Sequence, residues 1–290
     1  MYPKISIVTP TYNQGDYIED CINSILDQDY PNLEYIIIDG GSTDNTIDII
    51  KKYQSKINYW ISEKDAGIYD ALNKGFKEST GEIMGWLNSD DILHRKSLFT
   101  IADIFTTLTD VQWIQGYPTL IDEKGRIVYH QNARFKKSDF YLKEYHDGTF
   151  IQQESTYWTR ELWEKTGAHL STEWKYAGDF ELWMRFFTVK KLYTTSAMIG
   201  AFRYRGDKQI SIENYSSYLN ECDAIVEEYS QKLSKEEFSR ISKLKYLKSM
   251  KQKHPLIARL FTNRALERNS DKENKIVFDI KHNSFKLNDN

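Results

Sequence analysis

The first hundred residues alternate between short apolar runs and segments whose apolar residues recur with helical spacing. The apolar runs predict four buried strands, at residues 4–10, 33–39, 57–62 and 81–87. Helices are predicted between and after them, from Asp16, through Ile47–Ile50, from Gly67 to Ser79 and from about Arg95 to Thr107. Near-continuous apolar strands that alternate with helices are typical of a mostly parallel sheet covered by helices on both faces.

The pattern changes from about residue 111. Residues 111–130 predict a hairpin with its turn at Glu123-Lys124-Gly125, residues 176–187 an amphipathic helix, and residues 192–205 a strand that returns to the sheet. Beyond Asn214 the chain is helical and polar, and its last ~20 residues lack periodicity. We therefore expect an α/β domain at residues 1–212, with halves at 1–110 and 111–212, and a helical, basic C-terminal extension at 213–290.

Polar residues follow each of the four predicted strands. The segments are TPTYNQGD after the first strand, DGGSTDN after the second, SEKDAG after the third and NSDD after the fourth. Loops are polar in general, which explains one or two such segments. Four in succession favour a ligand site, because ligands of parallel α/β sheets bind at the carboxyl ends of the strands.

Asp90 and Asp91 are adjacent carboxylates at the end of an apolar strand. Such a pair needs solvent, a cationic partner or a metal ion, because burying unpaired charges is costly. An all-oxygen site suits Mg²⁺ or Mn²⁺, which use one or two carboxylates and complete their shell with water and phosphate oxygens. The alternative is that one aspartate caps the helix that follows.

Two further carboxylates have equally open interpretations. Asp39, followed by Gly40-Gly41, can accept hydrogen bonds from a base or ribose, or it can belong to an ordinary turn before a helix. No G-x-G-x-x-G motif and no Walker A lysine accompany it. Asp179, at the start of the predicted helix 176–187, is either a partner of the helix dipole or a general base, with Glu154 and Asp207 as rivals for that role.

Composition narrows the class of protein. Hydrophobic residues make up 40% of the 290 residues and charged residues 28%, which describes a globular chain, and the net charge of -3 gives no reason to expect nucleic-acid binding. Cys21 and Cys222 lie far apart in sequence, outside any metal-ligand spacing, and predict free thiols. No signal peptide or transmembrane run is recognised, so the sequence predicts a cytoplasmic protein.

Aromatic and basic residues each allow two interpretations. The 20 Tyr, 14 Phe and 7 Trp belong either to the core or to platforms on which sugars and bases stack. Between Lys232 and Arg264, ten basic residues stand against two acids. A cationic helix there either lies on an anionic membrane surface or is a solvated face that covers the α/β domain.

The motifs, taken in order, resemble those of the bacterial family 2 glycosyltransferases. The similar segments are IVTPTYNQGDYIEDCINSIL, IIIDGGSTDNT, GIYDALNKG, STGEIMGWLNSDD, QQESTYW and AGDFELWMR, which together span about residues 4–211. The resemblance implies the nucleotide-diphospho-sugar transferase fold called GT-A, with a nucleotide-binding half at 1–110 and an acceptor-binding half at 111–212. It also implies inverting transfer of a sugar from a nucleotide-diphosphate sugar to a glycan or lipid-linked acceptor, in bacterial surface polysaccharide biosynthesis.

The resemblance assigns roles to individual residues. It places Asp179 as the catalytic base, although the family's common Glu-Asp pair is Gly178-Asp179 here. It places the metal on Asp91 and Asp90, since Asn88 stands at the first position of the family's D-x-D-like motif. The residues it assigns to the nucleotide sugar are Thr9, Pro10, Tyr12, Asn13, Asp39, Asp65, Asn73, Lys74 and Asp90.

Arg203 and Arg205 complete the predicted set of site residues. Guanidinium groups suit bidentate contact with the leaving phosphates, and the equally open alternative is that both are surface charges beside Tyr204. Two other function classes also use such residues, a sugar-phosphate nucleotidyltransferase and a non-catalytic nucleotide-sugar binding protein. The first is disfavoured because TPTYNQGD lacks the basic residues of a nucleotidyltransferase loop.

Overall fold

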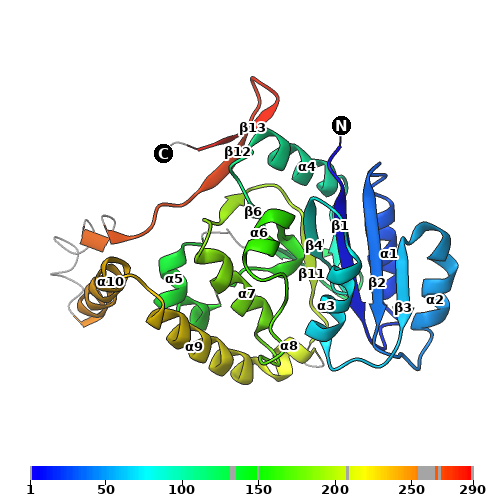
Figure 1. The fold of residues 1–290 in the computed structure, drawn as a ribbon, viewed down its shortest axis with the longest axis horizontal. Helices are drawn as coiled ribbons and strands as arrows, with labels where there is room; N and C mark the ends of the chain where they lie inside the picture. The colour runs from blue at the N-terminus through cyan, green and yellow to red at the C-terminus, as the bar shows by residue number, and fades with distance from the viewer. Residues whose placement is uncertain are drawn as a thin grey trace.

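The structure is a computed structural model that describes residues 2–130, 135–148, 150–206, 209–253, 265–266 and 269–288. Its centre is a nine-stranded sheet in the order β13-β12-β10-β6-β9-β4-β1-β2-β3 (Figure 1). The strands of its first half are β1 (Ile5–Thr11), β2 (Leu33–Asp39), β3 (Tyr59–Ser62) and β4 (Ile83–Trp86). All pairs among these four strands are parallel, as the apolar pattern predicts.

Strands from the second half extend the same sheet. They are β6 (Trp113–Gln115), β9 (Thr156–Thr159) and β10 (Tyr193–Thr195), of which β9 runs antiparallel to both of its neighbours. A smaller four-stranded sheet has the order β5-β11-β7-β8. Its strands are β5 (Ile92–Leu93), β7 (Thr119–Ile121), β8 (Ile127–His130) and β11 (Gly200–Arg203).

The predicted hairpin is confirmed in β7 and β8, whose turn contains Gly125 with a φ of 77°. The prediction of one strand over residues 192–205 was wrong, because this segment forms two strands in different sheets. β10 pairs with β6 in the large sheet, whereas β11 pairs with β5 and β7 in the small one. The small sheet therefore connects Asp91, the residue before β5, to the arginines at the end of β11.

Helices cover both faces of the large sheet. One face packs against α3 (Ile68–Glu78), α7 (Gly178–Phe187) and α9 (Tyr215–Gln231), and the other against α1 (Ile18–Leu26), α2 (Thr46–Tyr53) and α4 (Ser97–Thr107). The remaining α-helices are α5 (Lys137–Tyr141), α6 (Arg160–Lys165), α8 (Ile210–Glu213) and α10 (Lys235–Lys253). Short 3₁₀ helices are η1 (Gln54–Lys56), η2 (Glu144–Asp147) and η3 (Gln153–Ser155).

Alternation along single strands explains the two layers. In β2, Ile36 and Ile38 pack toward α3, whereas Tyr35 and Ile37 pack toward α1. The four residues are all buried, as expected for a strand with both faces covered. None of the helices in the described ranges is long and apolar enough to cross a membrane.

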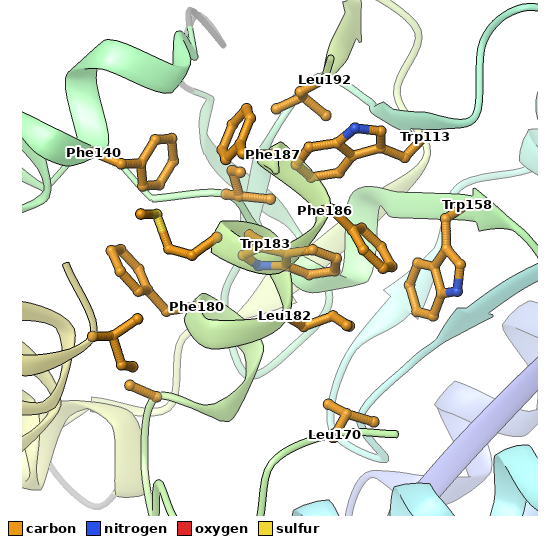
Figure 2. Packing of buried hydrophobic residues seen from close by; sticks show 14 of the residues in the cluster. Trp113, Phe140, Trp158, Leu170, Phe180, Leu182, Trp183, Phe186, Phe187 and Leu192 are labelled. Atoms are coloured by element: carbon orange, nitrogen blue, oxygen red, sulfur yellow. The ribbon is translucent and has the colours of Figure 1, made fainter. Parts of the chain in front are cut away.

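Five of the seven tryptophans are buried in the core, and Trp60 and Trp174 are partly buried. Trp183 of α7 stacks on Trp86 of β4 with ring centroids 5.7 Å apart and planes 5° apart. It also stacks on Trp113 of β6 at 5.9 Å (Figure 2). Trp158 also packs edge-on against Trp183 at 5.8 Å, and all four rings are fully buried. This aromatic packing fixes α7 on the sheet, and with it the position of Asp179.

The C-terminal extension differs from the prediction. It contains the helices α9 and α10, but its end forms a hairpin of β12 (Lys275–Asp279) and β13 (Ser284–Leu287). β12 pairs in parallel with β10, so the hairpin adds two strands to the edge of the large sheet. The expectation of a helical extension with an aperiodic end was therefore wrong for residues 275–287, because strands this short give too little periodicity to detect.

Candidate active site at the carboxyl ends of the strands

The carboxyl ends of the first parallel strands lie side by side. Thr11 of β1 is in register with Asp39 of β2, and Asp39 with Ser62 of β3. β4 pairs with the other side of β1, where Val8 is in register with Trp86, four residues before Asp90. The polar segments that follow the four strands thus share one edge of the sheet, as the sequence predicts.

Asp39 organises the loop after β2. Its buried carboxylate accepts hydrogen bonds from the backbone amides of Gly41 at 3.1 Å and Ser42 at 2.9 Å. It also accepts hydrogen bonds from the hydroxyls of Ser42 and of Ser62, the latter at 2.6 Å. The structure therefore places Asp39 at the predicted edge, with protein donors on both carboxylate oxygens.

Asn13 connects the first loop to the second. Its side-chain oxygen accepts a hydrogen bond from the backbone amide of Thr43 at 2.8 Å. The backbone amide of Asn13 donates to the Ser42 hydroxyl at 2.8 Å. The Asn13 φ of 51° lies in the left-handed region, which asparagine tolerates better than most residues. Tyr12 beside it is 58% exposed, so its ring is free of the core.

Thr9 and Pro10 lie inside the sheet rather than on its edge. Both residues are buried, and the Thr9 hydroxyl accepts a hydrogen bond from Tyr35 at 3.3 Å and lies 4.0 Å from the Cys21 sulfur. The Thr9 side chain is thus directed toward the α1 face of the sheet.

Asp65 lies against the loop that Asp39 organises. One of its oxygens accepts a hydrogen bond from the Gly67 amide at 2.9 Å. The other lies 2.7 Å from the point where a Cβ on Gly40 would stand, so a side chain at position 40 would displace the Asp65 carboxylate. The structure therefore brings Asp39 and Asp65 together on one wall.

Asn73 and Lys74 have protein partners. The Asn73 side chain donates to the Leu170 carbonyl at 2.9 Å and accepts from the Leu170 amide at 2.7 Å, which fixes α3 to the chain before α7. The Lys74 ammonium lies 2.8 Å from Glu63 and 3.4 Å from Asp70. Asn73 thus has a structural role that its sequence context does not reveal.

Asp90 and Asp91 are held by the end of β11. Asp91 is almost fully buried and accepts a hydrogen bond from the Arg203 amide at 2.8 Å. The Gln153 side chain donates to its other oxygen at 3.3 Å. Asp90 pairs with the Arg205 guanidinium at 2.7 Å.

Burial raises the pKa of both aspartates above the ordinary value. For Asp90 the Arg205 charge opposes this rise, whereas for Asp91 the Asp90 carboxylate adds to it. Adjacent carboxylates with raised pKa values gain from a cation that neutralises their charge.

The side chains of Asn88, Asp90 and Asp91 each offer oxygen atoms as metal ligands. The buried side-chain oxygen of Asn88 has no hydrogen-bond partner. Across the described ranges, no three His, Cys, Asp or Glu side chains are grouped so that they could hold a metal ion by themselves. Two carboxylates with an unpaired amide oxygen fit Mg²⁺ or Mn²⁺ as a partial ligand set, to be completed by water and phosphate oxygens.

Arg203 and Arg205 differ in burial and in the groups that they contact. The Arg203 guanidinium is buried and donates to the carbonyls of Asp90 at 2.7 Å and Glu123 at 2.9 Å, and to the Asp20 carboxylate at 3.1 Å. It thereby ties the loop of Asp90 to β11, so neither the phosphate-binding role nor the surface-charge alternative describes it. Arg205 is 19% exposed and contacts Asp90, which places it within reach of a ligand bound there.

Asp179 stands in the first turn of α7, opposite α3. Its carboxylate accepts a hydrogen bond from the Tyr69 hydroxyl at 3.3 Å. Burial raises the Asp179 pKa to about 6, against the opposing effects of the Phe180 backbone and Tyr69. A half-buried carboxylate that is ionised near neutral pH has the properties of a general base.

Glu154, the rival of Asp179, connects the two acidic regions. It is buried in η3, and one of its oxygens has no hydrogen-bond partner. Burial raises its pKa to about 8, and the charges of Asp90 and Asp179 both add to the rise. The Glu154 carboxyl group therefore interacts electrostatically with both Asp90 and Asp179. Because it is mostly protonated at pH 7, it is less suited than Asp179 to act as a general base. The other rival, Asp207, lies outside the described residues.

Three residues of this site were missed from the sequence. Gln153 contacts Asp91, Tyr69 contacts Asp179, and Glu221 of α9 binds the backbone before α7. The helical spacing around Tyr69 identifies its helix but not its hydroxyl's partner, which is 110 residues away. No sequence signal could have connected Glu221 to the site.

Comparison with known proteins identifies the family. The sequence model of the family Glycosyl transferase family 2 matches residues 6–166, which is more than half of the chain. The chain belongs to glycosyl transferase family 2. An uncharacterized glycosyltransferase of Rickettsia typhi is 31% identical to this family 2 chain over 250 residues, which cover 82% of the chain and 75% of that protein. The poly(ribitol-phosphate) beta-N-acetylglucosaminyltransferase TarS of Staphylococcus aureus is 34% identical over 100 residues, 33% of the chain and 18% of TarS.

Solved structures share the fold of the family 2 chain. TarS residues 1–349 in complex with UDP-GlcNAc superpose with a TM-score of 0.65 at 19% identity, covering 85% of this chain and 72% of that one. The mannosyltransferase PcManGT of Pyrobaculum calidifontis, in complex with GDP-Man and Mn²⁺, superposes with a TM-score of 0.58 at 18% identity, covering 93% and 73%. The predicted GT-A fold is confirmed. Some curated relatives are longer, and the chain spans 36% of one from Rickettsia bellii.

Proposed function

We propose that this chain transfers a sugar from a nucleotide-diphosphate sugar to a hydroxyl group of a glycan or lipid-linked acceptor. The observation that carries the proposal is the pairing, within a family 2 fold, of a metal-type carboxylate pair with a separate carboxylate of raised pKa. Asp90 and Asp91 form the pair, and Asp179 is the separate carboxylate. The negative charges of Asp90 and Asp179 both raise the pKa of Glu154, so this residue interacts with both parts of the site.

The nucleotide is proposed to bind where the loops after β1, β2 and β3 meet. Tyr12 offers an exposed ring, and Asn13, Asp39 and Asp65 line the wall described above. The complexes of TarS with UDP-GlcNAc and of PcManGT with GDP-Man support a nucleotide-sugar donor for a chain of this fold. Arg205, which is partly exposed beside Asp90, is the guanidinium placed to meet the diphosphate.

Asp91 and Asp90 are proposed to hold Mg²⁺ or Mn²⁺ together with the diphosphate, with Asn88 as a further oxygen ligand. The Mn²⁺ in the PcManGT complex supports a divalent ion in this fold. When bound, the ion supplies positive charge that stabilises the leaving diphosphate.

Asp179 is proposed to act as the general base of an inverting reaction. The acceptor oxygen forms a bond to the anomeric carbon while the bond from that carbon to the diphosphate oxygen breaks. The hydroxyl proton passes to the Asp179 carboxylate, and the electron pair of the broken bond leaves with the nucleoside diphosphate. Attack on the face opposite the diphosphate inverts the anomeric carbon.

The acceptor is proposed to belong to a bacterial cell-surface polysaccharide. The name of TarS describes transfer of N-acetylglucosamine to a poly(ribitol-phosphate) polymer, which supports an acceptor of this kind. In this proposal residues 1–110 bind the donor, residues 111–212 bind the acceptor, and residues 213–290 extend the domain.

The basic helix α10 is proposed to contact an anionic membrane surface from the cytoplasmic side. Only Ile241 and Leu244 of this helix are buried, whereas Lys243 and Lys245 are exposed and Tyr246 is 64% exposed. Cations beside an exposed aromatic ring favour an anionic interface. Arg259 and Arg264 lie outside the described residues. We expect the wild-type protein to sediment with phosphatidylserine vesicles and the double variant Lys243→Glu, Lys245→Glu to sediment less. This part of the proposal would be contradicted if the wild type did not sediment with the vesicles, or if the double variant sedimented equally.

Thermal unfolding with a panel of nucleotide sugars tests donor binding. We expect one donor, including candidates such as UDP-GlcNAc and GDP-mannose, to raise Tm when Mn²⁺ is present, because a ligand at 100 times its Kd stabilises a fold by about 2.7 kcal/mol. Asp91→Asn should lose most of this metal-dependent shift, and Asp48→Asn on the exposed face of α2 should keep it. No shift with any nucleotide sugar in Mn²⁺ would count against the proposal.

A further inference from the structure

The backbone immediately before α7 is held by a carboxylate from the C-terminal extension. Glu221 of α9 accepts hydrogen bonds from three consecutive amides, those of Lys175 at 3.2 Å, Tyr176 at 2.8 Å and Ala177 at 2.9 Å. These amides precede the first turn of α7, which contains Asp179. Hydrogen bonds to a charged acceptor are stronger than neutral ones, so one side chain fixes three successive residues.

A second contact fixes the same turn from α3. The buried Tyr69 hydroxyl lies 2.8 Å from the Tyr176 carbonyl and 3.3 Å from Oδ1 of Asp179. A Cβ on Gly178 would lie 2.8 Å from the Tyr69 ring, so the close approach of this ring requires glycine at 178. The peptide unit between Tyr176 and Ala177 is therefore held on both sides, its carbonyl by Tyr69 of α3 and its N–H by Glu221 of α9.

We propose that Glu221 and Tyr69 are positioning residues for Asp179, and that α9 supplies the supporting acid that Gly178 cannot. The inference rests on the proposed role of Asp179 as general base. It assigns to the C-terminal extension a part in the chemistry, although the family match ends at residue 166.

The two residues act on the ionisation of Asp179 with opposite signs. After burial, which is the largest cause of the raised pKa, the Tyr69 hydrogen bond lowers the pKa of Asp179 and the Glu221 charge raises it. The other titratable groups that sense Asp179 are Glu154 from η3 and Tyr218 and Cys222 from α9. Replacing Glu221 and Tyr69 should therefore displace the Asp179 titration in opposite directions.

The test measures kcat/KM against pH for wild type, Glu221→Gln and Tyr69→Phe, following release of the nucleoside diphosphate. A general base must be deprotonated, so wild-type kcat/KM should fall below about pH 6. In Glu221→Gln this acidic limb should move to lower pH, and in Tyr69→Phe to higher pH. Both variants should lose kcat, by roughly 10-fold to 100-fold, because a reacting group displaced by about 1 Å costs that much.

Controls separate positioning from folding. Glu228→Gln changes an exposed glutamate on the same helix, paired with Lys232, and should leave the profile unchanged. The donor-induced Tm shift should persist in Glu221→Gln and Tyr69→Phe, since the hydrogen bonds of these two residues go to the turn before α7 and to Asp179. Tyr69→Phe keeps the buried ring and gives a folded variant if Glu221→Gln is too unstable to assay.

Each outcome decides between the claims. If Asp179→Asn is inactive while Glu221→Gln and Tyr69→Phe have wild-type kcat and pH profiles, the positioning inference is wrong and the proposed function stands. If both variants lose activity but their acidic limbs stay at the wild-type pH, the two residues are structural only. If Asp179→Asn is fully active, the proposed base itself is wrong.

Discussion

At the scale of single residues, Asp39 illustrates how a buried carboxylate shapes a binding loop. Its oxygens accept four hydrogen bonds, two from backbone amides and two from hydroxyls. An asparagine would present an NH₂ group to some of these donors and leave them unsatisfied. We therefore expect Asp39→Asn to lower the free energy of unfolding by about 2–3 kcal/mol.

Chemical denaturation checks this prediction, with Asp48→Asn as the control on the exposed face of α2. The donor-induced Tm shift should shrink in Asp39→Asn as well, because Asn13 and Ser42 depend on the same loop. Equal stability of Asp39→Asn and wild type would show that the four hydrogen bonds contribute nothing net.

Residue-level expectations agree with the structure where they concern placement at a strand end. Asp39 ends β2, and Asp90 and Asp91 lie in the loop after β4, as the apolar runs before them predict, whereas their roles in binding stay predictions. Asn73 and Arg203 were given ligand-binding roles, yet the structure shows Asn73 bonded to Leu170, 97 residues away, and Arg203 to the Asp90 carbonyl, 113 residues away. Such partners depend on tertiary packing, which sequence spacing does not encode.

At the scale of elements, the first half of the sheet and α7 follow from hydrophobic periodicity, whereas the C-terminal hairpin does not. β12 and β13 have only five and four residues, and every one of these residues except Ile276 is exposed or intermediate. Their pairing depends on the edge that β10 offers, an element 80 residues earlier in the chain. A segment whose structure comes from a distant partner gives little signal of its own.

Because β12 pairs with β10, the C-terminal hairpin should contribute to the stability of the fold, which a segment that does not pack on the sheet would not do. Ile276 of β12 is fully buried, and Ile280 in the turn is 86% exposed. We expect Ile276→Ala to lower the free energy of unfolding by about 2–5 kcal/mol, because removing buried methyl groups leaves a cavity. Ile280→Ala is the matched control and should leave stability unchanged in the same urea titration. Equal effects of the two substitutions would mean that the hairpin does not pack on the sheet in solution.

At the scale of the whole molecule, one edge of the sheet gathers the carboxylates that follow its parallel strands, and α7 contributes Asp179 from the second half. Stacking of Trp183 on Trp86 and Trp113 holds this helix against β4 and β6. Figure 2 shows Trp183 beside Trp113. The C-terminal extension then fixes the turn before α7 through Glu221. The site therefore depends on residues between positions 12 and 221, which explains why no single motif in the sequence identifies it.

The most direct measurement compares nucleoside-diphosphate release by wild type and Asp179→Asn at saturating donor and pH 7.5. Because general-base catalysis contributes about 10²–10⁴-fold, release by Asp179→Asn should fall at least 100-fold, while the donor-induced Tm shift stays at the wild-type value. Asp223→Asn removes a partly buried carboxylate on α9 that is hydrogen-bonded to Tyr145, and this control should retain activity. Undiminished release by Asp179→Asn would contradict the account.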